Sequence, residues 1–123
     1  MKRKVLVVED DKVNAFIIKK LIADKFDLEI AYTPVEAQEA LKNESGYFAI
    51  LMDMDLGNDQ MDGAELLQVV RKTSGFEQIP VVATTAYSMK GDRERFLEQG
   101  FDDYLSKPID KHELLKLLDT LCS

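Results

Sequence analysis

The chain has 123 residues, 46% of them hydrophobic, which is enough for one core but not for an added cap or effector domain. Its 16 basic and 23 acidic residues give a net charge of −7, which repels nucleic acid and anionic lipid and argues against both as direct partners. The lone Cys122 cannot form an internal disulfide, and neither a signal peptide nor a membrane span is recognisable, so we expect one cytoplasmic domain over residues 1–123.

Strand-like and helix-like segments alternate along the chain. The first apolar run is continuous, as expected for a strand buried on both faces. Thr33-Pro34 predicts a helix start with proline at the first helical position, and Gly100 predicts a helix end. In chain order, the predicted elements are a strand over 4–8, a helix over 11–25, a strand over 28–32, a helix over 34–43, a strand over 47–53, a helix from 63 to about 74, a strand over 79–83, a helix over 89–99, a strand over 101–105 and a helix over 110–121.

The first predicted helix carries apolar residues at spacings of three and four. Val13, Phe16 and Ile17, followed by Leu21 and Ile22, form this series. Such a stripe is typical of the face that a helix buries, so we expect these side chains to pack against the sheet.

Five strand–helix units in 123 residues leave no room for a linker, a repeat or a low-complexity segment. Right-handed crossovers between parallel strands place helices on both faces of a doubly wound sheet. The expected fold is therefore α/β, a flavodoxin-like (βα)5 three-layer sandwich with strand order 2-1-3-4-5.

Polar residues follow four of the predicted strands. Glu9-Asp10-Asp11 follow the first strand, Asp53 the third, Thr84-Thr85 the fourth and Lys107 the fifth. The carboxyl ends of parallel strands share one edge of the sheet, where open α/β sheets bind their ligands. We therefore expect carboxylates, a hydroxyl and an ammonium group to converge there.

Three of the acids suit a metal ion. If Glu9, Asp10 and Asp53 lie within about 4 Å of one another, each pair repels by roughly 4 kcal/mol at an effective dielectric constant near 20. A cation must then be present, or one carboxylate stays protonated. Oxygen ligands in this number favour Mg²⁺. For Asp11 alone, capping of the following helix explains an acid equally well.

Asp53 is a candidate nucleophile, because a carboxylate can attack a phosphoryl donor and form an aspartyl-phosphate. Phosphoryl transfer depends on positioning and charge neutralisation, which Lys107 and Thr85 could supply beside a metal ion. Taken singly, Asp53 could merely end a strand and Lys107 could be a solvated loop residue. Their shared position at successive strand ends favours the functional interpretation.

Over residues 4–121 the chain resembles the receiver domain of two-component response regulators. The resemblance rests on the segments VLVVEDD at 5–11, LMD at 51–53 with MDG at 61–63, TTA at 84–86 and YLSKPI at 104–109.

The resemblance implies a role for each matching residue. Asp53 would be the phospho-acceptor, while Glu9, Asp10, Asp53 and the backbone carbonyl of Asp55 would bind Mg²⁺. It also implies that the Thr85 hydroxyl reorients toward the phosphoryl group, that Tyr104 moves with it, and that the bond before Pro108 is cis.

The implied partners are a histidine kinase or a histidine phosphotransfer protein, and an unknown downstream protein. The implied output face is the surface of 89–121, with homodimerisation of the phosphorylated form as one outcome. The domain would catalyse only its own phosphorylation and slow dephosphorylation.

One loop departs from the family pattern. Receivers commonly have proline four residues after the acceptor and Asp-Gly seven and eight after it. Here Gly57 holds the proline position, and Asp62-Gly63 lie nine and ten residues after Asp53, so the loop is about two residues longer. Gly57 predicts a turn with positive φ.

Three other functions fit the sequence less well. Asp53-Met54-Asp55 resembles the nucleophile and general acid of haloacid-dehalogenase-type phosphatases, but that motif normally follows the first strand. A flavin phosphate needs a loop rich in Gly, Ser or Thr after the first strand, where this chain has three acids. A degenerate receiver acting as a scaffold would lack a site residue. The lone His112, in the last predicted helix, is expected to be exposed.

Overall fold

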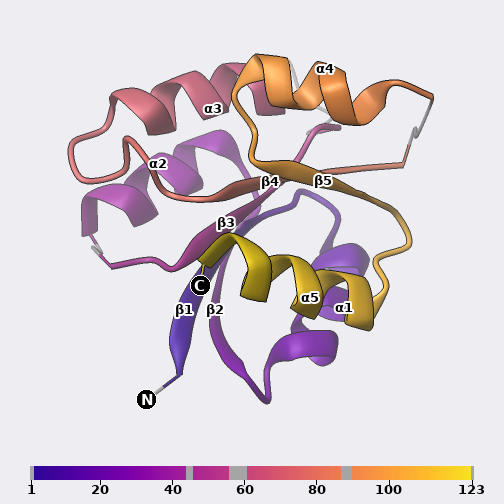
Figure 1. The fold of residues 1–123 in the computed structure, drawn as a ribbon. Coiled ribbons are helices and arrows are strands. Elements are labelled where there is room, and N and C mark those ends of the chain that lie inside the picture. The colour runs from indigo at the N-terminus through magenta and orange to yellow at the C-terminus, as the bar shows by residue number, and fades with distance from the viewer. Residues whose placement is uncertain (1, 44–45, 56–60, 87–89, 123) are drawn as a thin grey trace.

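Five parallel strands alternate with five helices in the computed structural model, which describes residues 2–43, 46–55, 61–86 and 90–122 (Figure 1). The strands pair in the order β2-β1-β3-β4-β5, so the predicted fold and strand order are confirmed. The elements are β1 (Arg3–Val8), α1 (Lys12–Ile22), β2 (Phe26–Ala31), α2 (Pro34–Asn43), β3 (Ala49–Asp53), α3 (Gly63–Lys72), β4 (Val81–Thr85), α4 (Asp92–Gln99), β5 (Asp103–Ser106) and α5 (Lys111–Cys122).

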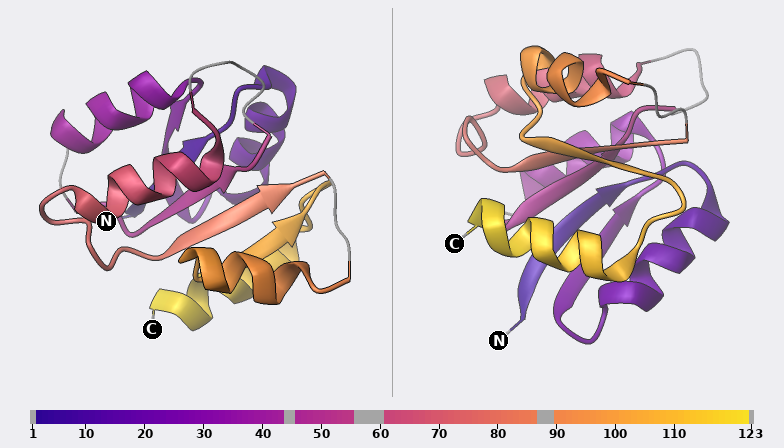
Figure 2. Two further views of the ribbon diagram at one scale, coloured as in Figure 1. Left: turned by 90° about the horizontal axis from the view of Figure 1, so that it is seen from above. Right: turned by 45° about the vertical axis from the view of Figure 1, so that its right-hand side comes forward.

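The helices form two layers around the sheet. Helices α2, α3 and α4 pack on one face through a core that includes Leu41, Leu66 and Phe96. Helices α1 and α5 pack side by side on the other face, where Ile18 and Leu114 belong to a second core (Figure 2). The central strands β3 and β4 and most of β1 are buried on both faces, which explains the apolar runs of β1 and β3, whereas the edge strands β2 and β5 are partly exposed.

The helix ends agree with the capping signals in the sequence. The Asp11 carboxylate accepts hydrogen bonds from Val13 N at 2.8 Å and Asn14 N at 3.2 Å, so it caps α1. Asp62 and Glu65 form a capping box at α3. Gly100 ends α4 with φ 109°, as predicted. The predicted start of this helix at Met89 lies outside the described residues.

The predicted buried face of α1 is wrong in part. The residues that α1 buries completely are Ala15, Ile18 and Ile22, whereas Val13 is 67%, Phe16 58% and Ile17 42% exposed. The helix carries two apolar stripes, so spacing alone could not show which one faces the sheet. Within the described residues, no helix is long and apolar enough to cross a membrane.

Candidate functional site

The acids that follow β1 and β3 meet at one edge of the sheet. Val8 and Met52 are paired in register, so the residues that follow them are neighbours. Carboxylate oxygens of Glu9, Asp10 and Asp53 all lie within 4.8 Å of one another. Glu9 and Asp53 are each 1% exposed, while Asp10 is exposed. The cluster therefore lies partly beneath the surface with one side open to solvent.

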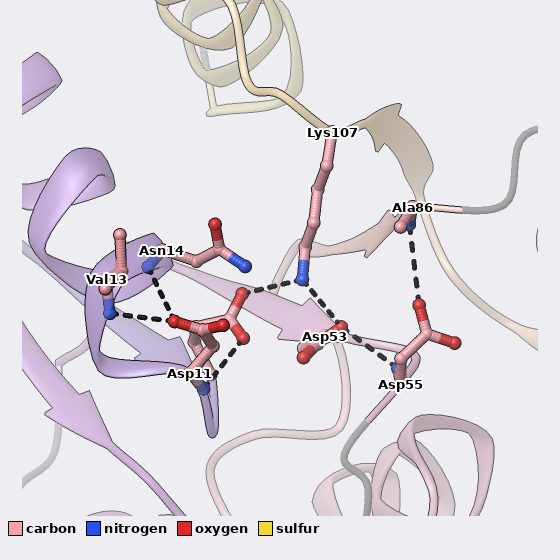
Figure 3. A network of polar contacts seen from close by, with 8 residues as sticks. Asp11, Val13, Asn14, Asp53, Asp55, Ala86 and Lys107 are labelled. Atoms are coloured by element: carbon pink, nitrogen blue, oxygen red, sulfur yellow. Dashed lines mark hydrogen bonds and ion pairs between the residues drawn. The ribbon is translucent and has the colours of Figure 1, made fainter.

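Lys107 reaches this cluster from the loop between β5 and α5 (Figure 3). Its Nζ lies 2.8 Å from Glu9 Oε1 and 3.0 Å from Asp53 Oδ1. Its backbone N donates to Thr85 O at 2.8 Å, which ties the loop to β4. The Lys107–Pro108 peptide bond is cis, as the resemblance implied. The lysine is thus held between two buried carboxylates.

The cluster carries more negative than positive charge, and its pKa values reflect this. Burial, followed by the nearby Asp53 carboxylate, raises the pKa of Glu9 to about 7. Burial and the charge of Asp53 also raise the pKa of Asp10. Burial lowers the pKa of Lys107, but Glu9 and Asp53 more than offset this, so the net shift is upward. Three acids share one ammonium group, so a further cation would be stabilised here.

The donor set fits Mg²⁺. Glu9, Asp10 and Asp53 offer only carboxylate oxygens, which are hard ligands. The exposed Asp10 gives access from solvent, and Mg²⁺ usually keeps several waters. The residues present therefore match the ion that the sequence predicted.

Asp55 contributes mainly through its backbone. Its N–H donates to Asp53 Oδ1 at 3.0 Å, which helps to orient that carboxylate. Its own side chain is exposed, with Oδ2 3.4 Å from Ala86 N (Figure 3). A backbone role, rather than general acid chemistry by the carboxylate, is consistent with this arrangement.

The two predicted switch residues occupy different places. Thr85 is 3% exposed at the end of β4, next to the strand that ends in Asp53. Tyr104 packs beneath α4 instead of at the carboxylates, with its ring centroid 5.4 Å from that of Phe96. The structure brings Glu9, Asp10, Asp53 and Lys107 together directly, with Thr85 at the adjacent strand end.

One site contact was missed by sequence reasoning. Asp11 N donates to Glu9 Oε2 at 3.2 Å, so the residue that caps α1 also orients a carboxylate of the cluster. No sequence pattern distinguishes this backbone contact. The predicted turn at Gly57 lies outside the described residues, and His112 is exposed on α5 as expected.

A family model for the response regulator receiver domain matches residues 5–119. The chain belongs to the receiver domain family. As a receiver domain it is a phospho-acceptor signalling module of two-component systems, and the cluster of Glu9, Asp10 and Asp53 is consistent with a phospho-acceptor site that holds a metal ion. This assignment favours the receiver interpretation over the phosphatase and flavin-binding alternatives.

Individual relatives support the assignment. The chain is 29% identical to the receiver domain of the Pseudomonas aeruginosa sensor histidine kinase PA1611, a crystal structure with magnesium in the active-site cleft; the match has a TM-score of 0.86 and covers 99% of this chain and 98% of that one. It is 34% identical to the polar-differentiation response regulator DivK of Brucella ovis, covering 89% of this chain and 87% of DivK.

A longer relative contains a receiver as one part. The chain is 39% identical to a segment of hybrid signal transduction histidine kinase I of Dictyostelium discoideum, covering 96% of this chain but 7% of the kinase. The receiver domain thus resembles both a short regulator and a small part of a hybrid kinase.

Proposed function

We propose that Asp53 accepts a phosphoryl group from the phosphohistidine of a histidine kinase or histidine phosphotransfer protein. The observation that carries this proposal is the Asp53 carboxylate, buried between Glu9 and Lys107 and oriented by Lys107 Nζ and Asp55 N. The proposed ligands of Mg²⁺ are Glu9, Asp10, Asp53 and the backbone carbonyl of Asp55. The proposed location is the cytoplasm, where ATP is the source of the phosphoryl group of such donors. Residues 1–123 are proposed to form a single domain.

In the transfer, an Asp53 carboxylate oxygen attacks the phosphorus atom of phosphohistidine. The new O–P bond forms as the P–N bond breaks, and the imidazole nitrogen keeps the electron pair and takes up a proton. Lys107 Nζ, already beside Asp53 Oδ1, would stabilise the negative charge of the transferred group. Bound Mg²⁺ would supply further neutralisation of that charge.

The exposed face of α1 is the proposed docking surface for the phosphodonor. Val13, Phe16 and Ile17 are exposed on it, and Ile17 lines a small depression together with Lys107 and Pro108. Lysines at 12, 19 and 20 accompany this apolar stripe, and α1 contains no acidic residue. The surface thus fits a protein with an apolar centre and acidic flanks, although the whole chain is acidic.

We propose that the signal leaves through Thr85 and Tyr104. A phosphoryl group adds about −1.5 to −2 charge at the site, which would attract the Thr85 hydroxyl. Tyr104 could then fill the vacated space, and the output surface over 89–121 would change for its target or for a second copy. Amide chemical shifts of Thr85→Ala with a beryllofluoride mimic test this: full changes across that surface in the variant would refute the route.

Labelling by a small-molecule phosphodonor tests the acceptor. We expect Mg²⁺-dependent addition of one phosphoryl group, detected by intact mass, and its loss in Asp53→Asn. Asp55→Asn is the matched control, because it keeps the backbone contacts and should still be labelled. Equal labelling of Asp53→Asn would refute the proposal. Turnover of a phosphate ester that is lost in Asp55→Asn would instead favour a phosphatase.

A further inference from the structure

Gly63 differs from the other glycines that the structure describes. Gly46, Gly75, Gly91 and Gly100 all have positive φ, a conformation that other residues rarely adopt. Gly63 is the buried first residue of α3 and does not have positive φ. Its backbone would therefore accept alanine, which has the higher helix propensity. Glycine at this position must therefore be explained by the atoms that occupy the space around its Cα.

That space is taken by the backbone of the proposed acceptor. A Cβ atom at Gly63 would lie 2.8 Å from the Asp53 carbonyl oxygen, 2.9 Å from Met54 Sδ and 3.1 Å from Met54 Cα. The thioether of Met54 could rotate away. The carbonyl oxygen and the Cα belong to the main chain, so they can move only if β3 or α3 moves.

Both of these elements are held in place. Asp53 pairs with Thr84 in the sheet, and Met54 N donates to Thr84 O at 2.9 Å. At the start of α3, the Asp62 capping box fixes the first turn, while Leu66 is fully buried. A methyl group at position 63 must therefore displace the helix, the acceptor peptide or both, because packed interiors adjust poorly to added volume.

We propose that Gly63 is a positioning residue for the phospho-acceptor site. Its bare Cα lets the start of α3 pack directly on the Asp53 carbonyl, which fixes the main chain that carries Asp53 and, two residues later, the Asp55 carbonyl. The two extra residues that the sequence places between Asp53 and Asp62 leave this contact intact. The inference rests on the proposed role of Asp53.

Gly63→Ala tests the inference. Since a misplacement of about 1 Å can cost 10²-fold in rate, we expect labelling at Asp53 and Mg²⁺ affinity each to fall by about tenfold or more. Amide signals of Met54, Asp55 and Thr84 should shift in the metal-free protein. The matched control is Asp62→Ala, which weakens the same helix end without adding an atom near Asp53. It should lower the unfolding midpoint but keep labelling and Mg²⁺ affinity within about twofold.

A double variant isolates the contact with the acceptor. Met54→Ala combined with Gly63→Ala removes the thioether contact but keeps the contact with the Asp53 carbonyl, so labelling should stay slow relative to Met54→Ala alone. If Gly63→Ala alone does not fold, the labelling rate of this double variant is measured in its place. Recovery to the rate of Met54→Ala, or wild-type behaviour of Gly63→Ala, would overturn the inference. An unlabelled wild type would instead refute the acceptor proposal, and the Mg²⁺ affinities and amide shifts would then decide the role of Gly63.

Discussion

The two ends of the sheet both contain charged side chains, but their charges are balanced differently. Near the amino end of β4, Arg71 donates to Ile79 O at 2.6 Å and Gly100 O at 3.2 Å, and pairs with Asp102 at 3.1 Å. Asp102 also accepts from Val81 N at 2.8 Å. There one cation meets one anion. At the carboxyl end, three carboxylates share one ammonium group.

The charged groups at the first end contribute to stability, and those at the second end contribute to function. The Arg71 network joins α3, β4 and the start of β5 without any ligand, so it contributes to stability in every state of the domain. The carboxylate cluster reaches charge balance only with a further cation. We therefore expect changes at the first end to alter stability and changes at the second to alter phosphoryl transfer and metal binding.

Lys107→Met gives the largest expected effect. It removes the cation that would meet the transferred group, so labelling of Asp53 should slow by about 10²–10³-fold. The rate of labelling at saturating Mg²⁺ is the measurement. Lys107→Arg, which retains charge but changes donor geometry, should recover part of the rate. Rapid labelling of Lys107→Met would show that the lysine is a structural partner only.

Arg71→Met is the corresponding change at the other end. It leaves the Asp102 carboxylate with a backbone donor but without its cation, and two carbonyl groups lose a partner. We expect the free energy of unfolding to fall by about 2 kcal/mol, measured in urea, with Mg²⁺-dependent labelling unchanged under folding conditions. A labelling defect as large as that of Lys107→Met would remove the distinction between the two ends.

Glu9→Gln tests the excess negative charge of the carboxylate cluster through the pH dependence of stability. The pKa of Glu9 is near 7 in the folded chain against an ordinary 4.5, so between these values the folded state binds a proton that the unfolded state has released. The stability of the metal-free protein should therefore decrease as pH rises from about 4.5 to 7. Glu9→Gln should lose this slope and be more stable by about 2 kcal/mol at pH 8, yet bind Mg²⁺ more weakly.

Urea unfolding in chelator at pH 5 and pH 8 measures the effect. The cluster contains Asp10, Asp53 and Lys107 as further charged groups. The free energies of unfolding of the variant and the wild type are therefore compared at both pH values. An identical pH slope in the two proteins would show that Glu9 is ionised throughout.

Phe16→Ser gives the smallest expected effect. Phe16 is 58% exposed, so its loss should change stability little, and labelling by a small donor should be unaffected. Transfer from a phosphohistidine protein should slow by about tenfold if α1 is the docking surface. The control is Val35→Ser on α2, where the side chain is 51% exposed. Equal slowing by both variants would refute a specific role for α1.

The fold and the core of the site were predictable because a strand end can be recognised from a few neighbouring residues, an apolar run followed by a polar side chain. The four residues of β3 that precede Asp53 are all apolar, and the parallel fold makes the ends of such runs converge. The buried face of α1 was not predictable, because its sequence offers two apolar stripes. The Arg71–Asp102 pair also escaped prediction, since its residues are 31 apart and belong to no motif. Likewise, the Asp-Gly pattern marked Gly63, but only packing reveals what its missing Cβ avoids.

Helix α4 joins the hydrophobic core through a single apolar side chain. Phe96 is the one buried apolar side chain of this eight-residue helix, and it packs against the rings of Phe101 and Tyr104 at centroid distances of 5.9 and 5.4 Å. Among the described residues, no side chain caps the amino end of the helix. At the surface of α4, Arg93 pairs with Asp103 and Gln68 Nε2 donates to Gln99 O. In the proposed route, movement of the Tyr104 ring would take away one of the two aromatic rings that contact Phe96, the side chain through which α4 joins the core.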